Sequence, residues 1–260
     1  MGGTRMIESD SQYAVSVDSW HDKERNETTA NRMPEKIFNG IRVTNPGFGL
    51  NVYHNTLSQD EVSKIINALE SNLKNNGPYK WNEAFVTNST TPIKKARDCV
   101  DFKMNSKALG PVNESNKELH EVYSKVFDTL RKCVDDYCRY WGINVNFYEV
   151  FNFVKYEGEG KHFRIHADDG PMYKCAVSAV FYLNDDYEGG EIHFPRLENL
   201  TVKPGVGDIA IFPSNYMYEH ASLPMKSGTK YCVVVMMDIN NLAHKDNPYG
   251  IIINNDGTMA

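Results

Sequence analysis

The sequence predicts an α+β protein rich in β-structure, in which a β-sandwich or jelly roll is buttressed on one face by helices. From Asn146 onward, short runs rich in β-branched and aromatic residues follow one another: NFYEVFNFVKY, KCAVSAVFYLN, GEIHF, LTVK, GDIAIF and KYCVVVMMD. Aspartate, glycine and proline pairs separate these runs, as expected for strands joined by tight turns. Two stretches with helical spacing precede them, and helices followed by many short strands favour this architecture.

The length and composition favour one main domain. The chain has 260 residues, of which 41% are hydrophobic, enough to bury a sizeable core. Residues 1–34 are polar, mixed in charge and aperiodic, so we expect a flexible N-terminal arm. Residues 35–260 then form a single domain, with helical support at about 57–142, a β-rich core at about 145–240 and a C-terminal tail at 241–260.

The first helix is predicted from its start signal and its apolar face. Ser58 followed by Glu61 makes a capping box, and the stretch FGLNVYHN before it looks like a strand. Gly77-Pro78 stops the helix. The residues that share its apolar face are Val62, Ile65, Ile66, Leu69 and Leu73.

The second helix is predicted at about 115–141, ending before Gly142, with apolar residues at three-to-four spacing. We expect it to lie flat against a sheet. Between the helices, the stretch NSTTPIKKARDC at 88–99 resembles a loop and carries three basic residues. Two interpretations of the 84–98 region stay open: a solvated surface loop, or a mobile lip over a site.

Charge and cysteine content narrow the function classes. The formal net charge of −6 disfavours nucleic acid and anionic membranes as partners. The five cysteines are odd in number and lack CxxC spacing, and no signal peptide or long apolar run is visible. These features predict reduced thiols and a cytoplasmic protein that does not insert into a membrane.

The stretch HFRIHADDG contains an H-x-D pair, His166 and Asp168, whose side chains share one face of an extended strand. Two imidazoles and one carboxylate form the facial set that non-haem Fe(II) uses, with three positions left open. His220, between two strands, is the favoured third ligand over His193, which lies within a strand. His162 is expected to pack or support the site, because four-residue spacing gathers ligands on helices only. The same ligands could also hold zinc.

A lysine stands ten residues beyond His220. Lys230 begins the otherwise apolar run KYCVVVMMD. Burying its ammonium is costly unless an anion meets it. The alternative is a strand-end lysine whose head group reaches solvent.

The second half, about residues 145–240, resembles the 2-oxoglutarate and Fe(II)-dependent oxygenases of the prolyl 4-hydroxylase-like group. The resemblance rests on YEGEGKHFRIHAD, VFYLNDDYEGGEIHFP, VKPGVGDIAIFPS and YEHASLPMKSGTKY in this order and spacing. It implies a double-stranded β-helix of the cupin-like, jelly-roll type. It further implies that His166, Asp168 and His220 ligate iron. Lys230 would pair with the distal carboxylate of 2-oxoglutarate, Tyr182 would help to hold that carboxylate, and Tyr156 would line the co-substrate pocket.

The resemblance implies a dioxygenase that uses Fe(II), 2-oxoglutarate and O₂, with ascorbate as a possible reductant, and that releases succinate and CO₂. The favoured reaction is hydroxylation of a prolyl residue in a peptide or protein. Alternatives are a lysyl residue, a free amino acid, another small molecule or an alkylated base, or a non-catalytic β-helix that only binds a ligand. The sequence departs from the family at one position. Six residues after the basic residue, where the family often has a tryptophan, this sequence has Met236. Pocket shape is therefore expected to differ.

Overall fold

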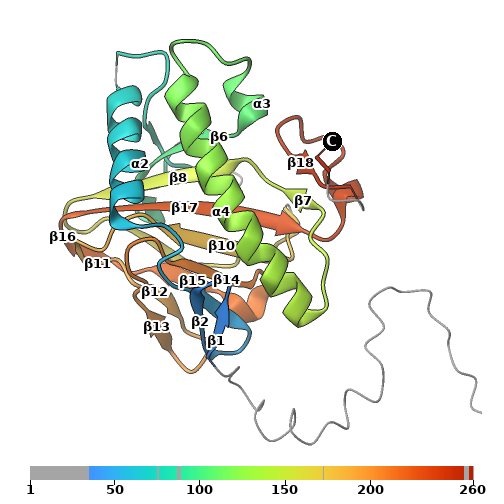
Figure 1. Ribbon diagram of the computed structural model, residues 1–260. Coiled ribbons are helices and arrows are strands. Elements are labelled where there is room, and N and C mark those ends of the chain that lie inside the picture. The colour runs from blue at the N-terminus through green and yellow to red at the C-terminus, as the bar shows by residue number, and fades with distance from the viewer. Residues whose placement is uncertain (1–34, 75, 87–88, 172, 255–257, 260) are drawn as a thin grey trace, which may run out of the picture.

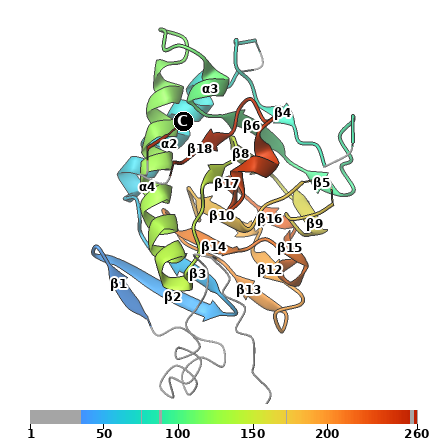
Figure 2. The same ribbon diagram turned by 90° about the vertical axis from the view of Figure 1, so that its right-hand side faces the viewer.

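The computed structural model describes residues 35–74, 76–86, 89–171, 173–254 and 258–259. The expected flexible arm at 1–34 lies outside the described residues. The described part of the chain forms layers, with two helices over one face of a large sheet and a smaller sheet on the opposite side (Figures 1 and 2). The two main helices are α2 (Gln59–Asn72) and α4 (Lys117–Trp141), and α3 (Ser106–Leu109) is a single turn. None of the helices in the described ranges is long and apolar enough to cross a membrane.

The large sheet is antiparallel throughout and carries the main core strands. Its strands, in spatial order, are β1 (Lys36–Phe38), β2 (Ile41–Gly47), β3 (Leu50–Tyr53), β14 (Ile209–Pro213), β10 (Val177–Tyr182), β17 (Thr229–Asp238), β8 (Phe151–Glu157), β6 (Val100–Met104) and β4 (Asn82–Glu83). The short strand β7 (Phe147–Tyr148) pairs with β17 and with β18 (Ile251–Ile252), so part of the C-terminal tail joins the sheet. The tail also contains the 3₁₀ turn η3 (Asn241–His244).

The smaller sheet holds the histidines singled out in the sequence. Its strands, in spatial order, are β13 (Leu200–Val202), β12 (Ile192–Phe194), β15 (His220–Ser222), β9 (His162–His166) and β5 (Arg97–Asp98). A two-stranded ribbon of β11 (Glu188–Gly189) and β16 (Met225–Ser227) lies beside it. Two sheets with helices on one side confirm the predicted β-rich α+β class with a double-stranded β-helix core.

The region expected to be helical support contains strands as well. Within 57–142, β4 and β6 extend the large sheet beside β8, and β5 extends the small sheet beside β9. The interpretation of 88–99 as loop alone is therefore wrong at its end, where Arg97 and Asp98 pair with β9. Short strands of this kind carry little periodicity of their own, because their pairing with distant segments creates them.

Strand alternation divides the interior of the large sheet into two faces. On β17, Val233, Val235 and Met237 join the core beneath the helices. The alternate residues Lys230, Cys232, Val234 and Met236 face the opposite side and line a pocket. On β8, Phe151 and Phe153 face the helices, whereas Asn152 and Tyr156 face the pocket. A period of two residues thus sets which side chains can form a site.

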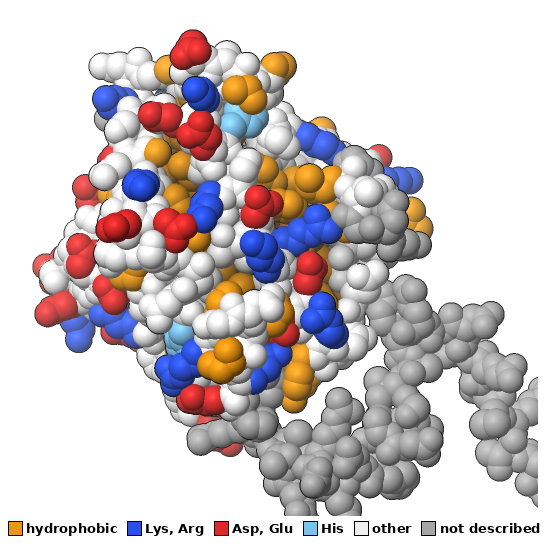
Figure 3. Space-filling view, in the orientation of Figure 1, with side chains coloured by type: hydrophobic (Ala, Val, Ile, Leu, Met, Phe, Trp, Pro, Cys, Tyr) orange, Lys and Arg blue, Asp and Glu red, His pale blue; other side chains and the backbone are white. Residues whose placement is uncertain are grey.

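Helix α2 begins at its predicted cap and α4 ends before its predicted glycine, but α2 ends at Asn72, before the predicted stop at Gly77-Pro78. Ser58 caps α2 by accepting from the Glu61 backbone N–H, and the Glu61 carboxylate accepts from the Ser58 N–H, which confirms the capping box. Helix α4 ends at Gly142, whose φ of 67° lies in the left-handed region that favours glycine. Buried residues of both helices pack against the large sheet, as predicted for α4. Figure 3 shows basic and acidic side chains interspersed across this helix-covered face.

Candidate metal centre and adjoining pocket

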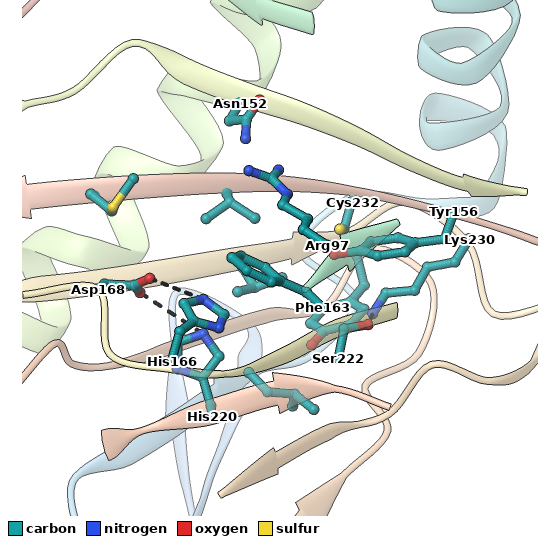
Figure 4. A pocket seen from close by; sticks show the side chains of 15 residues that line it. Arg97, Asn152, Tyr156, Phe163, His166, Asp168, His220, Ser222, Lys230 and Cys232 are labelled. Carbon is teal, nitrogen blue, oxygen red and sulfur yellow. Dashed lines mark hydrogen bonds and ion pairs between the residues drawn. The ribbon is translucent and has the colours of Figure 1, made fainter. Parts of the chain in front are cut away.

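Pairing between β9 and β15 places two imidazoles side by side. His220 is the register partner of His166, and the centroids of the two rings lie 4.5 Å apart. Asp168 follows β9 directly, with Oδ1 3.5 Å from His166 Nε2 and Oδ2 3.9 Å from His220 Nε2 (Figure 4). One ligand atom from each residue lies within 4.8 Å of the others. This group could hold one metal ion.

Backbone carbonyls orient both imidazoles. His166 Nδ1 lies 2.8 Å from the carbonyl oxygen of Arg164, and His220 Nδ1 lies 3.0 Å from that of Tyr218. A carbonyl oxygen can only accept, so each Nδ1 carries the hydrogen and each Nε2 keeps its lone pair. Both Nε2 atoms are therefore presented as metal ligands, supported from behind as metal-binding histidines usually are.

The electrostatics favour a neutral His220 beside an ionised Asp168. Burial lowers the pKa of His220 to about 4, although Asp168 acts in the opposite direction. Burial alone would raise the pKa of Asp168. Its contacts with His220, His166 and Ser178 outweigh burial and hold that pKa below its usual value. Metal binding requires these protonation states, and this donor set suits Fe(II).

The other candidate histidines are placed elsewhere. His193 lies within β12, and its Nδ1 is 2.9 Å from Thr201 Oγ1. His162 begins β9, where its Nδ1 is 2.8 Å from the Gly160 carbonyl oxygen. Neither belongs to the metal-holding group found among the described residues, which agrees with the preference for His220.

The pocket beside the three residues encloses about 590 Å³ of space, part of it open to solvent. Its walls are largely apolar and aromatic, with a few polar groups at its ends. Figure 4 shows Lys230 on one side of the pocket and the three candidate ligands on the other, with the Arg97 side chain between them and its guanidinium toward Asn152. Concave apolar pockets with few converging polar groups are typical ligand sites.

Lys230 is buried, with 2% of its surface exposed. Its ammonium donates to the Gly190 carbonyl oxygen at 2.6 Å and to Ser222 Oγ at 3.2 Å, and no ion pair joins it to a carboxylate of the described residues. Burial lowers its pKa. Position 190 favours glycine, because its φ is 67° and a Cβ there would lie 2.6 Å from Met225 Sδ, which would have to shift.

Two tyrosine rings flank this ammonium. The ring centroids of Tyr156 and Tyr182 lie 5.1 Å and 5.3 Å from Lys230 Nζ. The buried hydroxyl of Tyr182 has no hydrogen-bond partner. A buried cation without an anion and an orphaned hydroxyl are both unfavourable. A carboxylate bound between them would satisfy both, so the residues fit an anionic co-substrate such as 2-oxoglutarate.

Arg97 is the pocket residue that the sequence did not reveal. It was expected in a surface loop, but strand β5 directs it inward, 4.8 Å above the Phe163 ring. Its guanidinium pairs with Asp101 at 3.3 Å and donates to the Phe85 carbonyl oxygen at 3.0 Å. When the Asn152 side-chain amide is oriented so that both its nitrogen and its oxygen have partners, the Asn152 oxygen accepts a hydrogen bond from Arg97 Nη2 at 3.1 Å. Arg97 Nε is buried without a partner.

Three lysines that do not line this pocket are paired with carboxylates. Lys94 pairs with Glu83, Lys161 with Asp98 and Lys174 with Asp169, at 2.8, 2.9 and 3.5 Å. A basic rim for an acidic peptide therefore has little support. Met236 lines the pocket beside Val234, so the position where the family often has tryptophan does face the site.

Comparison with known proteins agrees with this geometry. Residues 151–237 match the family model of the 2OG-Fe(II) oxygenase superfamily, and this match covers the three candidate ligands and Lys230. No curated protein matches the sequence. The matched segment, about a third of the chain, is thus similar to the 2OG-Fe(II) oxygenases.

Solved structures share the fold at low sequence identity. One is a prolyl hydroxylase from Trichoplax adhaerens in complex with a peptide fragment of the hypoxia inducible factor oxygen degradation domain, at 15% identity and a TM-score of 0.56, covering 74% of this chain and 84% of that one. A Pseudomonas putida prolyl-4-hydroxylase matches at 19% identity and a TM-score of 0.52, covering 74% of this chain and 93% of that one. A viral collagen prolyl hydroxylase from Paramecium Bursaria Chlorella virus-1, in a 2OG complex, matches at 20% identity and a TM-score of 0.50. The match covers 73% of this chain and 96% of that one. The fold is thus that of prolyl 4-hydroxylase-like oxygenases.

Proposed function

We propose that this chain, whose residues 151–237 match the 2OG-Fe(II) oxygenase superfamily, hydroxylates a prolyl residue of a peptide or protein substrate. One observation carries the proposal. The metal-holding group of His166, Asp168 and His220 lines the same pocket as the buried Lys230 ammonium, which has no carboxylate partner among the described residues.

His166, Asp168 and His220 would hold Fe(II), leaving the remaining positions for ligands other than protein. Lys230 would receive the distal carboxylate of 2-oxoglutarate, with the Tyr182 hydroxyl as a second donor. Tyr156 would form the wall beside the lysine stem, where its ring already packs. When bound, Fe(II), 2-oxoglutarate and O₂ supply the oxidative decarboxylation that yields succinate and CO₂ and the oxygen atom for the C–H bond. Ascorbate would serve as a reductant that keeps the iron ferrous.

The protein's own contribution is to bind, orient and shield. Ile192, Val180 and Val234 give the pocket apolar walls that exclude water from the reacting groups. Lys230 and the metal ligands would fix the co-substrate at both ends, since they line one continuous pocket.

A peptide substrate suits the part of the pocket that Arg97 lines. The charge of Arg97 is already balanced by Asp101, so its free Nε–H favours a neutral acceptor over a second carboxylate. A peptide carbonyl oxygen is such an acceptor. The neighbouring Phe163 ring and Met236 side chain would pack against an apolar residue such as proline. The peptide-bound neighbour from Trichoplax adhaerens supports this choice by analogy of fold.

Succinate formation tests the proposal. The purified protein would be incubated in air with Fe(II), ascorbate and 2-oxoglutarate, alone or with proline peptides, free proline, lysine peptides or alkylated oligonucleotides. We expect proline peptides to stimulate succinate formation and to gain about 16 Da, the mass of one oxygen atom. His220→Ala should abolish both signals, because it removes one of three metal ligands.

Other outcomes have distinct meanings. Stimulation and oxygen gain with another substrate class would keep the dioxygenase and overturn the prolyl assignment. Absence of succinate in protein that binds both iron and 2-oxoglutarate would contradict turnover and favour a β-helix that only binds these ligands.

A further inference from the structure

Two buried serines are linked to the candidate metal centre but do not line the pocket. Ser178 on β10 is fully buried, and Ser214, directly after β14, is 1% exposed. Ser178 Oγ lies 2.5 Å from Asp168 Oδ2 and 2.7 Å from Ser214 Oγ. The three side chains form a continuous hydrogen-bonded chain that ends on the carboxylate.

The direction of this chain follows from the chemistry of its ends. An ionised carboxylate can only accept, so the Ser178 hydroxyl donates to Asp168. The Ser178 oxygen is then free to accept, and the Ser214 hydroxyl is the donor. Hydroxyls linked in this order polarise one another, which strengthens the final bond to the carboxylate.

The backbone holds the two serines in place. Ser178 is paired within the large sheet with Phe212 on one side and Met236 on the other. The Ser214 N–H donates to the Ala176 carbonyl oxygen at 3.0 Å, and the Ser214 carbonyl oxygen accepts from the Asp169 N–H at 3.0 Å. The segment that carries Asp168 is therefore fixed to the same two strands that carry the hydroxyls.

We propose that Ser178, oriented by Ser214, is a positioning residue that restricts Asp168 to one-oxygen metal ligation. Its hydroxyl occupies Oδ2 and leaves Oδ1, 3.5 Å from His166 Nε2, for the metal. A carboxylate that bound through both oxygens would take one of the three positions that the facial arrangement leaves open. This inference rests on the proposed function, because it requires a metal at this site.

Cobalt binding tests the proposal without relying on turnover. Co(II) alone would be titrated into metal-free wild type, Ser178→Ala, Ser178→Cys, Ser178→Thr and Ser214→Ala, with affinity and visible absorption recorded. Loss of an interaction behind a metal ligand typically weakens metal binding about 10- to 100-fold, and we expect this for Ser178→Ala. The cobalt spectrum should also change, because the carboxylate is free to bind through both oxygens.

The additional variants separate the hydroxyl from packing. Ser178→Thr keeps the hydroxyl and should restore affinity and spectrum toward wild type. Ser178→Cys keeps the shape with a much weaker donor, so it should resemble Ser178→Ala and serves if the alanine variant does not fold. Ser214→Ala should lose less metal affinity. Ser178 then keeps its hydrogen bond to Asp168 and loses only the hydrogen bond that it accepts from Ser214.

The results distinguish this inference from the function on which it rests. Wild-type affinity and an unchanged spectrum in Ser178→Ala or Ser178→Cys would overturn the positioning role and leave the metal site intact. Equal weakening in Ser178→Thr would also overturn it, because the hydroxyl would then not be the cause. Failure of wild-type protein to bind cobalt would overturn the metal site itself, and this inference with it.

Discussion

At the scale of single residues, Lys230 connects a sequence pattern to a chemical role. It begins a strand of otherwise apolar character, and the structure buries it between two tyrosine rings without a carboxylate partner among the described residues. A buried ammonium of this kind is costly unless a bound anion offsets the cost. Its position therefore favours ligand binding over stability.

Lys230→Ala should weaken 2-oxoglutarate binding strongly and leave metal binding nearly unchanged. Truncating one partner of a buried, hydrogen-bonded charge pair costs about 2–5 kcal/mol, which corresponds to about 30-fold or more in affinity. The measurement is the 2-oxoglutarate dependence of succinate formation, alongside Co(II) affinity. Exposed Lys203, whose ammonium lies over the Tyr187 ring, offers a matched control as Lys203→Ala. An unchanged 2-oxoglutarate requirement in Lys230→Ala would show that Lys230 does not hold the co-substrate.

Arg97→Lys should impair use of the peptide substrate but not use of 2-oxoglutarate. Lysine keeps the charge that balances Asp101 but lacks the fork of donors and the free Nε–H. Losing a hydrogen bond to a buried acceptor costs about 1–3 kcal/mol, so we expect KM for the peptide to rise about 5- to 150-fold. The 2-oxoglutarate requirement should not change. Steady-state kinetics with Lys95→Ala as the surface control checks this, and an equal effect on both KM values would refute a substrate-specific role.

At the scale of elements, the turn before β14 is tied to the end of β3 by one carboxylate. Asp208 is 4% exposed and accepts hydrogen bonds from His54 Nδ1 and from the backbone N–H groups of Asn55 and Gly205, each at 2.9 Å. Burial alone would raise its pKa, but these hydrogen bonds outweigh burial and hold the pKa below its usual value. This contact fixes the start of β14, whose neighbouring strand β10 carries Ser178.

Asp208→Asn should destabilise the protein in a pH-dependent way. A carboxyl group whose folded pKa is lowered stabilises the fold above its unfolded pKa of about 3.9, and the stabilisation is lost as pH falls through the folded value. We expect a loss of about 1–3 kcal/mol in the free energy of unfolding at pH 7. The difference from wild type should shrink below about pH 3.9. Urea unfolding across this range, with the exposed Asp185→Asn as control, measures it, and a difference that grew on acidification would reverse the assigned sign.

The sequence predicted those elements whose signals are local. The Ser58–Glu61 capping box, the end of α4 at Gly142 and the strand that carries Lys230 follow from spacing and periodicity. The positions of His166, Asp168 and His220 in one group agree with the resemblance to the oxygenases. The sequence did not reveal Arg97 or Ser178, because their roles depend on pairing between segments far apart in the chain. The stretch RDCVDF, which begins with Arg97, was the available signal for a strand there.

At the scale of the whole molecule, the helices and the two sheets have separate tasks. The core between the helices and the large sheet is apolar, and the opposite face of the same strands carries the pocket. The candidate site is thereby placed on a rigid support, and its ligand-binding groups line a pocket that is partly open to solvent. Without ligands, the stability of the fold comes from this core. Ligands that bind the folded protein should therefore add to its stability.

Metal and 2-oxoglutarate should raise the thermal stability stepwise. A ligand at 100 times its Kd stabilises the native state by about 2.7 kcal/mol. In a domain of this size, each kcal/mol raises the Tm by about 2–4 °C. Adding Co(II) and then 2-oxoglutarate should give two increments, and a chelator should remove both. Lys230→Ala should lose only the second increment, and His220→Ala should lose the first; an undiminished metal increment in His220→Ala would place the metal elsewhere.

The most direct test of the central claim is the visible absorption of anaerobic protein titrated with Fe(II) and 2-oxoglutarate. The proposed site predicts a weak charge-transfer band that requires both additions, saturates at one iron per chain, and is lost in His166→Ala. Absence of the band in folded wild-type protein that has bound iron, or its persistence in His166→Ala, would contradict an iron and 2-oxoglutarate site at His166, Asp168 and His220.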